Sequence, residues 1–338
     1  MKRWDVIISG YGTVGRQAGR LLLERQERYR KRYGADVRIV GALRSAAGSY
    51  DADGLTLDQL RAFSADAGAG RPEWTGADFL ESCAYHVLIE AGPSDIQTGG
   101  HALEAMRAAL GGGKHVIAIS KGALVADYPG LSALARENGV QLKVSGATAA
   151  ALPTVDLLAY NLAGCEISLM EGIFTGTANY VLTAMMDERL SLTQAIERAQ
   201  QMGIAEPDPR FDLEGWDTAC KLTILANAAF GAPLRLSDVK REGIEQLTHE
   251  QLAAWRAAGL VPKLVGRLQS AQGRVEAAVE LRLLEPTHPF VHVRGTTKAV
   301  RVETDTMGEL LVIGGKSDPV AAAAAALKDL EHLLQQSG

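Results

Sequence analysis

Short apolar runs alternate with amphipathic segments through the first half of the chain. Runs typical of buried strands lie at residues 5–9, 37–43, 87–90, 115–119 and 141–144. Helical periodicity between them predicts helices at residues 14–33, 100–110 and 131–138. Strands that alternate with helices form βαβ units, whose strands pair in parallel under helices on both faces. We therefore predict an α/β domain with a doubly wound parallel sheet over residues 1–150.

The pattern changes after Pro153. Longer helical stretches lie at residues 154–163, 178–187, 192–201 and 215–230. From residue 262 to 302, apolar and polar residues alternate, as in antiparallel strands with one solvated face. The sequence therefore predicts a second, α+β domain at residues 151–302. The segment 303–338, with a helix at residues 319–335, is expected to complete the first domain.

The amino-acid composition limits which classes of protein the chain can belong to. The 338 residues suffice for two domains, 47% of them are hydrophobic, and the net charge of −5 argues against nucleic-acid binding. The three cysteines, Cys83, Cys165 and Cys220, lack metal-ligand spacing, so we predict no metal site and reduced thiols in the cytoplasm. The chain starts with a strand rather than an apolar leader, and no run approaches the ~18 apolar residues of a membrane span.

A glycine motif joins the first strand to the first helix. In Gly10-x-Gly12-x-x-Gly15, the missing side chains let the backbone approach a pyrophosphate, and the N–H groups of the helix start stabilise its charge. Thr13 and Val14 lie at that helix start and are expected to contact the cofactor. The alternative is an ordinary strand-to-helix turn. The βαβ context favours a Rossmann-type, dinucleotide-binding domain.

The second strand ends at Arg44 and Ser45, where NAD enzymes usually have an acidic residue for the ribose hydroxyls. An arginine and a serine there suit a 2′-phosphate, so we predict a preference for NADP, with NAD as the alternative cofactor. A solvated loop arginine would give the same sequence.

An acidic loop precedes the second informative helix. Glu206 and Asp212 lie in a proline-containing segment, and Asp217 and Lys221 follow at helical i, i+4 spacing. A lysine in a partly dry site can exchange a proton near neutral pH, and the carboxylates can hold a substrate ammonium group. The alternative is a surface ion pair of about 0.3–0.5 kcal/mol.

These segments resemble those of homoserine dehydrogenases over nearly the whole chain. The similar stretches are the Gly10–Gly15 loop, Gly113-Lys-His-Val-Ile-Ala-Ile-Ser-Lys121, Glu171-Gly-Ile-Phe-Thr-Gly-Thr-Ala-Asn-Tyr180, the Glu206–Lys221 segment, and His288-Pro289 with residues 300–314. The resemblance implies reversible reduction of aspartate 4-semialdehyde to homoserine, a step in threonine and methionine biosynthesis.

The resemblance also implies roles for individual residues. Lys221 would be the proton donor, Asp217 would orient it and contact substrate, and Glu206 would bind the substrate amino group. Lys121 resembles a second catalytic lysine near the nicotinamide. The predicted substrate-binding residues are Glu206, Asp212, Asp217, Gly176 and Thr177. Predicted cofactor contacts beyond the glycine loop are Arg44, Ser45, Gly92, Pro93, Lys121, Gly203 and Gly315.

Assembly and regulation follow from the same resemblance. The alternating strands of the second domain and the family likeness imply a homodimer that shares a sheet. The chain is also expected to lack a C-terminal regulatory domain for amino acids, and hence threonine feedback through one.

Several positions depart from the family pattern. An asparagine is replaced by Ser120 and another by Thr175, and a glutamate that helps to bind a monovalent cation is replaced by Ser145, so no such site is expected. The other departures are a glycine-rich turn at Ala149–Ala151, a Gly-Ala-Gly turn at Lys316-Ser-Asp318, and an asparagine at Lys298.

Two alternatives to a homoserine dehydrogenase stay open. One is a reductase of another small aldehyde, against which Glu206 argues because it would be left unpaired. The other is a catalytically silent NADP-binding sensor or assembly protein, against which the intact pair Asp217 and Lys221 argues.

Overall fold

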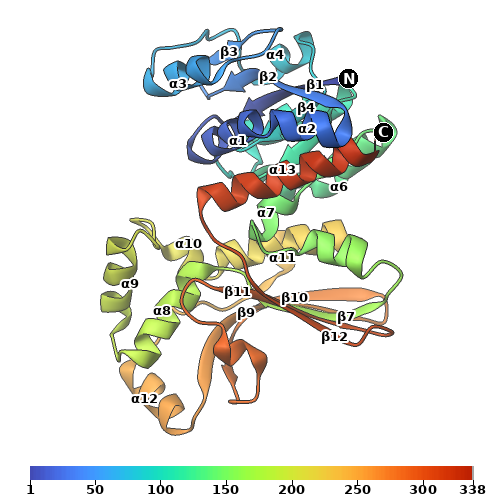
Figure 1. The fold of residues 1–338 in the computed structure, drawn as a ribbon. Helices are drawn as coiled ribbons and strands as arrows, with labels where there is room; N and C mark the ends of the chain where they lie inside the picture. The colour runs from blue at the N-terminus through green and yellow to red at the C-terminus, as the bar shows by residue number, and fades with distance from the viewer. Residues whose placement is uncertain (337–338) are drawn as a thin grey trace. The chain divides into compact units, whose positions relative to one another are not determined.

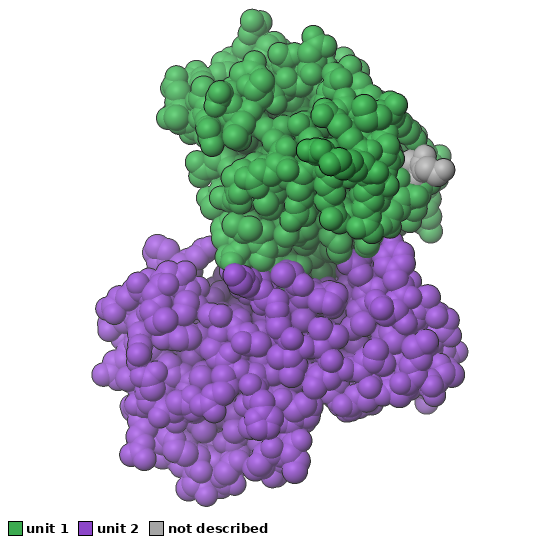
Figure 2. Space-filling view, viewed as in Figure 1, with its two compact units in different colours: residues 1–150, 318–338 green, residues 151–317 purple. Residues whose placement is uncertain are grey.

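The computed structural model describes residues 1–336 and divides into two compact units (Figures 1 and 2). Unit 1 comprises Met1–Ala150 and Asp318–Gly338, and unit 2 comprises Ala151–Ser317. The sequence predicts that the chain returns to the first domain at residue 303. In the structure it returns to unit 1 at Asp318. The reason is that the alternating segment after residue 303 continues the sheet of unit 2.

Unit 1 is built on a six-stranded sheet in the order β3-β2-β1-β4-β5-β6. All neighbours are parallel except β2 and β3, which confirms the predicted fold class. The strand order reverses around β1, and in such sheets a dinucleotide binds outside the carboxyl ends of the strands at that point. The strands are β1 Lys2–Ser9, β2 Ala35–Leu43, β3 Gly48–Tyr50, β4 Val87–Glu90, β5 His115–Ala118 and β6 Leu142–Lys143.

Helices connect these strands. The predicted helix at residues 14–33 is two helices, because the chain bends at Arg25 and α2 then buries Tyr29 alone. Among the described residues no helix is long and apolar enough to cross a membrane. The helices of unit 1 are α1 Thr13–Glu24, α2 Gln26–Tyr33, α3 Leu57–Ala65, α4 Gly76–Ser82, α5 Gly100–Gly111, α6 Gly122–Glu137, α7 Ser145–Ala149 and α13 Pro319–Gln336.

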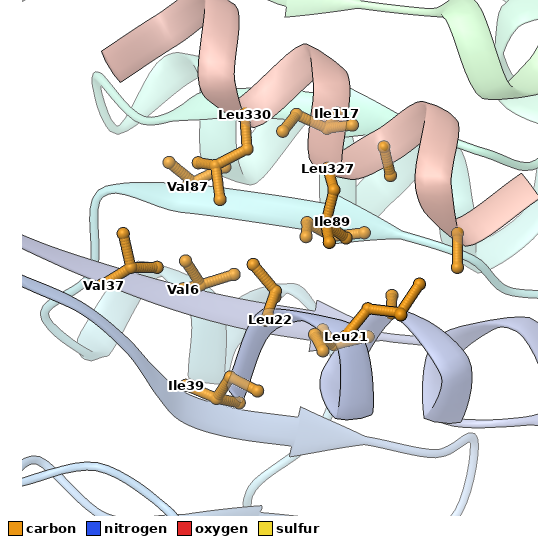
Figure 3. Packing of buried hydrophobic residues seen from close by; sticks show 14 of the residues in the cluster. Val6, Leu21, Leu22, Val37, Ile39, Val87, Ile89, Ile117, Leu327 and Leu330 are labelled. Carbon is orange, nitrogen blue, oxygen red and sulfur yellow. The ribbon is translucent and has the colours of Figure 1, made fainter. Parts of the chain in front are cut away.

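The C-terminal helix α13 completes the core of unit 1. It packs beside α1 on one face of the sheet, so residues more than 300 positions apart share one apolar cluster (Figure 3). Burying each such side chain contributes about 1.5–3 kcal/mol. The labelled members are Val6, Leu21, Leu22, Val37, Ile39, Val87, Ile89, Ile117, Leu327 and Leu330.

Unit 2 contains a second six-stranded sheet, in the order β12-β11-β7-β9-β10-β8. Its neighbours are antiparallel except β8 and β10, as the alternation predicts. The turn between β9 and β10 has Gln272 at φ 51° and Gly273 at φ 75°, which suits the right-handed twist of a hairpin. The strands are β7 Ile167–Ile173, β8 Lys240–Arg241, β9 Val261–Ala271, β10 Arg274–Leu284, β11 Lys298–Thr304 and β12 Glu309–Gly314.

Helices α8 and α11 of unit 2 pack against β9 of this sheet. The predicted helix at residues 154–163 contains the π-helical turn Leu157–Asn161. The helices are α8 Gly176–Asp187, α9 Leu192–Gln201, α10 Arg210–Leu213, α11 Trp216–Ala229 and α12 His249–Ala257, with short 3₁₀ turns at Leu236–Asp238 and Pro289–His292.

Ala150, the last residue of the first segment of unit 1, has a φ of 52°. A side chain at positive φ is strained, whereas glycine adopts this conformation without a steric penalty. The departure from a glycine-rich turn at Ala149–Ala151 therefore carries a backbone cost at its central residue.

Candidate active site

The glycine loop has the geometry of a pyrophosphate site. Gly10 has a φ of 85°, and the N–H groups of Gly10 and Tyr11 both donate to Leu43 O, at 2.9 and 2.8 Å. A Cβ on Gly15 would lie 2.3 Å from Gly10 O, so only glycine lets α1 approach β1 this closely. A Cβ on Gly12 would meet nothing within 4 Å, so the backbone there is open to a ligand.

Helix α1 begins directly after Gly12, and no side chain caps it. Thr13 is exposed and Val14 is half-buried in its first turn. Their backbone N–H groups belong to the uncapped turn, which together with the helix dipole favours an anion. Gly12, Thr13 and Val14 thus form an open helix start, and Gly10 and Gly15 pack closely against each other beside it.

Arg44 lies at the end of β2, as predicted, but its guanidinium already has partners. It donates to Asp66 O at 3.1 Å and to Ala69 O at 2.6 Å, and it lies 4.1 Å from the ring centroid of Phe63. Ser45 beside it is exposed. The guanidinium is therefore held rigidly at the edge where a ribose would lie, and a 2′-phosphate would have to share it with these carbonyls.

The connection after β4 lies against the glycine loop. A Cβ on Gly10 would lie 2.2 Å from the nitrogen of Gly92, and Pro93 follows as an exposed residue. Beneath this connection, the side chain of Glu90 accepts a hydrogen bond from the N–H of Gly92 at 2.7 Å and one from the hydroxyl of Ser120. Glu90 is 1% exposed, and this burial raises the pKa of its carboxyl to about 7.

Unit 2 brings Lys221 and Asp217 together on one face of α11. Lys221 Nζ lies 2.5 Å from Asp217 Oδ2 and donates to Phe174 O at 2.8 Å. The hydroxyl of Thr175 also donates to Asp217 Oδ2, at 2.8 Å. Both charged side chains are largely buried, with exposed fractions of 13% for Lys221 and 9% for Asp217. This excludes the alternative of a surface ion pair.

The start of α8 follows directly from this pair. Thr175 precedes the helix, but its hydroxyl binds Asp217 and does not cap α8. Among the described residues, the first N–H groups, those of Gly176 and Thr177, therefore have no side-chain cap. The hydroxyl of Thr177 donates to Ile204 O at 3.3 Å, which ties α8 to the turn at Gly203.

The acidic loop carries the remaining predicted substrate residues. Glu206 is exposed, and within residues 1–336 its carboxylate makes no hydrogen bond or ion pair. Gln200 holds the backbone of this segment by donating to Glu206 O at 3.1 Å. Asp212 lies in α10, half-buried, and its carbonyl accepts from Gly215 N at 3.2 Å, just before α11. Glu206 is thus available to a cationic ligand.

Comparison with known proteins identifies the family. Residues 153–330 match the family model described as homoserine dehydrogenase, and residues 10–145 match the one described as its NAD-binding domain. The chain belongs to the homoserine dehydrogenase family. Its members are NAD(P)-dependent oxidoreductases that act on a CH–OH group.

Individual homoserine dehydrogenases match over nearly their full lengths. The enzyme of Methanocaldococcus jannaschii is 33% identical over 97% of this chain and 98% of its own. A protein of Pseudomonas canavaninivorans named NAD(+)-dependent homoserine dehydrogenase is 32% identical over 100% of this chain and 98% of its own. A crystal structure from Archaeoglobus fulgidus with the same enzyme name has a TM-score of 0.89 at 33% identity and covers 98% of this chain and 99% of its own.

Two departures from the homoserine dehydrogenase pattern take part in the sites themselves. Thr175 binds Asp217, and Ser120 binds Glu90. A third, Ser145, donates from its backbone and its hydroxyl to the fully buried carboxylate of Asp329 in α13, at 3.2 and 2.8 Å. At these three positions the replacement is therefore bonded to a carboxylate.

Residues in and beside the altered C-terminal turn make structural contacts. Asp318 accepts from Ala321 N at 2.8 Å in the first turn of α13. Gly315, at φ 80°, lies against the backbone of Leu152, whose nitrogen is 2.7 Å from the position of a Cβ. Gly315 therefore could not carry a side chain without a backbone shift.

Lys263 is a buried residue that the sequence analysis missed. It is 2% exposed on β9, and its Nζ donates to Asn179 Oδ1 at 2.8 Å and to Val293 O. Burial lowers the pKa of this amine to about 8. Asn179 in turn donates to Gly295 O at 2.9 Å and to Thr297 O at 3.1 Å. The signal in the sequence is a single lysine within the apolar run at residues 260–266.

This arrangement supports the start of α8. The loop that Asn179 holds includes Thr296, whose carbonyl oxygen lies 3.0 Å from the position of a Cβ on Gly176. Lys263 is therefore connected to the start of α8 through Asn179 and the loop.

We expect the free energy of unfolding to depend on pH because the amine of Lys263 is buried in the folded protein. Its pKa is about 8 in the folded protein and near 10.5 when unfolded. Between these values the unfolded chain binds more protons, so the free energy of unfolding should rise with pH, by on the order of 2 kcal/mol. Urea unfolding of wild type and Lys263→Met at pH 7.5–10.5 measures this, and the variant should lack that part of the rise. Identical pH slopes in the two proteins would contradict the assignment.

Proposed function

We propose that this chain interconverts L-aspartate 4-semialdehyde and L-homoserine, with Lys221 as the proton donor. One observation carries the proposal. An ammonium group has three N–H donors, and within the described residues Lys221 uses two of them, for Asp217 and Phe174 O. The third is left for a substrate carbonyl oxygen.

The mechanism divides between the cofactor and the chain. A dihydronicotinamide held by the glycine loop would supply hydride to the aldehyde carbon. Lys221 Nζ gives its proton to the carbonyl oxygen as negative charge develops there, and in the reverse direction the neutral amine takes the proton from the alcohol. Asp217 keeps the ammonium group in place, and its own charge is favoured by its position in the first turn of α11.

Substrate recognition falls to the groups around this pair. Glu206, exposed and without a partner in residues 1–336, suits the substrate ammonium group. The uncapped N–H groups of Gly176 and Thr177 suit its carboxylate. Asp212 and Asp217 add negative charge on the ammonium side. A reductase of aldehydes without an amino group would leave Glu206 unused, and a silent cofactor-binding protein would not need the Lys221–Asp217 pair.

Cofactor binding falls to the glycine loop, Gly92, Pro93 and Lys121 of unit 1. We infer a preference for NADP from Arg44 and Ser45, with NAD as the second cofactor, since one relative at 32% identity is named NAD(+)-dependent. Lys121 ends the connection from β5 and directly precedes α6, at the carboxyl end of β5, and is assigned to the nicotinamide side. Gly203 and Gly315 of unit 2 are assigned to the cofactor by family resemblance.

A homodimer is part of the proposal. Within residues 1–336, the edge strand β12 of unit 2 has no neighbour on one side, and Leu311 and Ile313 are 37% and 47% exposed on it. A second copy would cover these side chains. A cytoplasmic location, in the pathways to threonine and methionine, fits the three free cysteines.

Lys221→Ala should lower kcat by about 10²–10⁴, the range for lost acid–base catalysis, and leave the Kd for NADPH unchanged. Stopped-flow oxidation of NADPH by aspartate semialdehyde and fluorescence titration of NADPH measure the two quantities. Lys240→Ala, at an exposed position of β8, is the matched control and should behave as wild type.

The same assay with a deaminated semialdehyde tests the substrate. Wild type should prefer the amino substrate, and Glu206→Gln should lose most of that preference. A normal kcat in Lys221→Ala would refute its role. Equal kcat/KM for the two aldehydes in wild type would refute the substrate.

Arg44→Ala should lower the ratio of kcat/KM for NADPH to that for NADH by about 10–100-fold, because a charged hydrogen bond to phosphate contributes about 1.5–3 kcal/mol. Arg44 also braces Asp66 and Ala69, and loss of that support would lower both values together. Only a change in the ratio of the two kcat/KM values therefore supports a contact between Arg44 and the 2′-phosphate. An unchanged ratio would show that Arg44 does not make this contact.

Ile313→Glu should shift the protein from dimer to monomer, since a charge in an apolar interface is not compensated there. Sedimentation equilibrium should give twice the 35.9 kDa chain mass for wild type and the chain mass for the variant. Val320→Glu, a similarly exposed position on α13, is the control and should stay dimeric. If wild type sediments with the mass of a single chain, the proposal of a dimer is wrong.

A further inference from the structure

Glu90 is a buried carboxyl for which the reaction described above has no use. It ends β4, directly beneath the crevice at the carboxyl ends of the strands, and is 1% exposed. Its Oε1 accepts from Gly92 N at 2.7 Å, and its Oε2 accepts from the hydroxyl of Ser120. Within residues 1–336 no cationic side chain pairs with it. A buried carboxyl without a cation costs free energy, so its presence at this position needs a reason.

The two connections that Glu90 joins are bound to each other at further points. The N–H of Lys121 donates to Ser94 Oγ at 2.9 Å. A Cβ on Gly122 would lie 2.6 Å from the backbone of Asp95. The connection after β4 and the connection after β5 therefore form one layer, and the Glu90 carboxyl lies at its base.

This layer also lies against the glycine loop. Ala91 N donates to Ser9 O at 2.8 Å, and the nitrogen of Gly92 is 2.2 Å from the position of a Cβ on Gly10. A dinucleotide with its adenosine ribose at the end of β2 would extend its nicotinamide half over β4 and β5. The layer would then be the floor under that half.

We infer that Glu90 is a positioning residue of the cofactor site, which holds this floor through Gly92 and Ser120 and takes up a proton when the dinucleotide binds. The inference rests on the proposed cofactor site.

The charges around Glu90 fix the direction of the proton movement. Ser9 and Gly10 of the β1 connection are uncharged, and from the β5 connection Glu90 meets the hydroxyl and N–H of Ser120, so burial alone raises its pKa, to about 7. A pyrophosphate on the glycine loop brings negative charge to the other side of Gly92. That charge favours the protonated carboxyl further.

Protonation keeps both contacts of the carboxyl but reverses the direction of one hydrogen bond. A proton from solvent on Oε2 would be donated to Ser120 Oγ, because a hydroxyl can accept as well as donate. Oε1 would go on accepting from Gly92 N. Ser120 can therefore bond to either protonation state, and the floor keeps its shape while its charge changes.

The test is direct binding of NADPH, by fluorescence titration at pH 5.5–9 and by calorimetry in two buffers of different ionisation enthalpy. In wild type the Kd should rise above pH 7, about tenfold for each unit by which the cofactor raises the pKa of Glu90, with net proton uptake near pH 7. Glu90→Gln, neutral at every pH, should bind as wild type does at low pH, without the rise and without the uptake. Glu90→Ala should bind at least about tenfold more weakly at all pH values. Glu137→Gln, an exposed carboxyl on α6, is the control.

The outcomes separate this inference from the proposed function. A wild-type protein that binds no NADPH or NADH would overturn the proposed cofactor site itself. Tight binding with the same pH profile and proton uptake in wild type and Glu90→Gln would overturn the proton coupling. Unaltered affinity in Glu90→Ala, with a melting temperature close to wild type, would overturn the positioning role.

Discussion

The contact between Lys221 Nζ and Asp217 Oδ2 depends on the chain segment that crosses beside it. Lys221 also binds the carbonyl of Phe174, and Asp217 also binds the hydroxyl of Thr175. Phe174 and Thr175 form the connection between β7 and α8. One pair of opposite charges therefore fixes the position of a helix start, and the third donor of the lysine is aimed by the same bonds. A buried pair is costly to break, because either partner alone would be an uncompensated charge.

Close backbone approach has the corresponding function in unit 1. Gly15 lets α1 contact β1, and Gly10 lets the connection after β4 contact the glycine loop. A side chain at either position would push apart surfaces that a dinucleotide must touch together. Glu90 and Ser120 lie just below these contacts. The glycines leave the space, and the Glu90 carboxyl accepts a hydrogen bond from the backbone that lines it, at Gly92.

Much of this architecture follows from periodicity and spacing, because both are local. The alternation of strands and helices gave the parallel sheet, and the i, i+4 spacing placed Asp217 and Lys221 on one face. Contacts that depend on strand pairing could not be predicted. Glu90 and Ser120 are 30 residues apart and meet only because β4 pairs with β5. Thr175 and Asp217 are 42 residues apart, and Lys263 meets Asn179 across 84. An apolar run also does not indicate where a lysine inside it finds its acceptors.

The place of α13 in the core has a consequence for how the chain is made. Leu327 and Leu330 pack beside Leu21 and Leu22, so the first 150 residues lack part of their core until the last helix arrives (Figure 3). Unit 2 is contiguous and contains all the strands of its own sheet. During synthesis from the N-terminus, unit 2 can therefore reach its final packing before α13 has been made. The first 150 residues cannot complete their core until then. Unit 2 can then mature before unit 1, although most of unit 1 is translated first, and a chaperone that shields apolar surface would be needed longest by the first residues made.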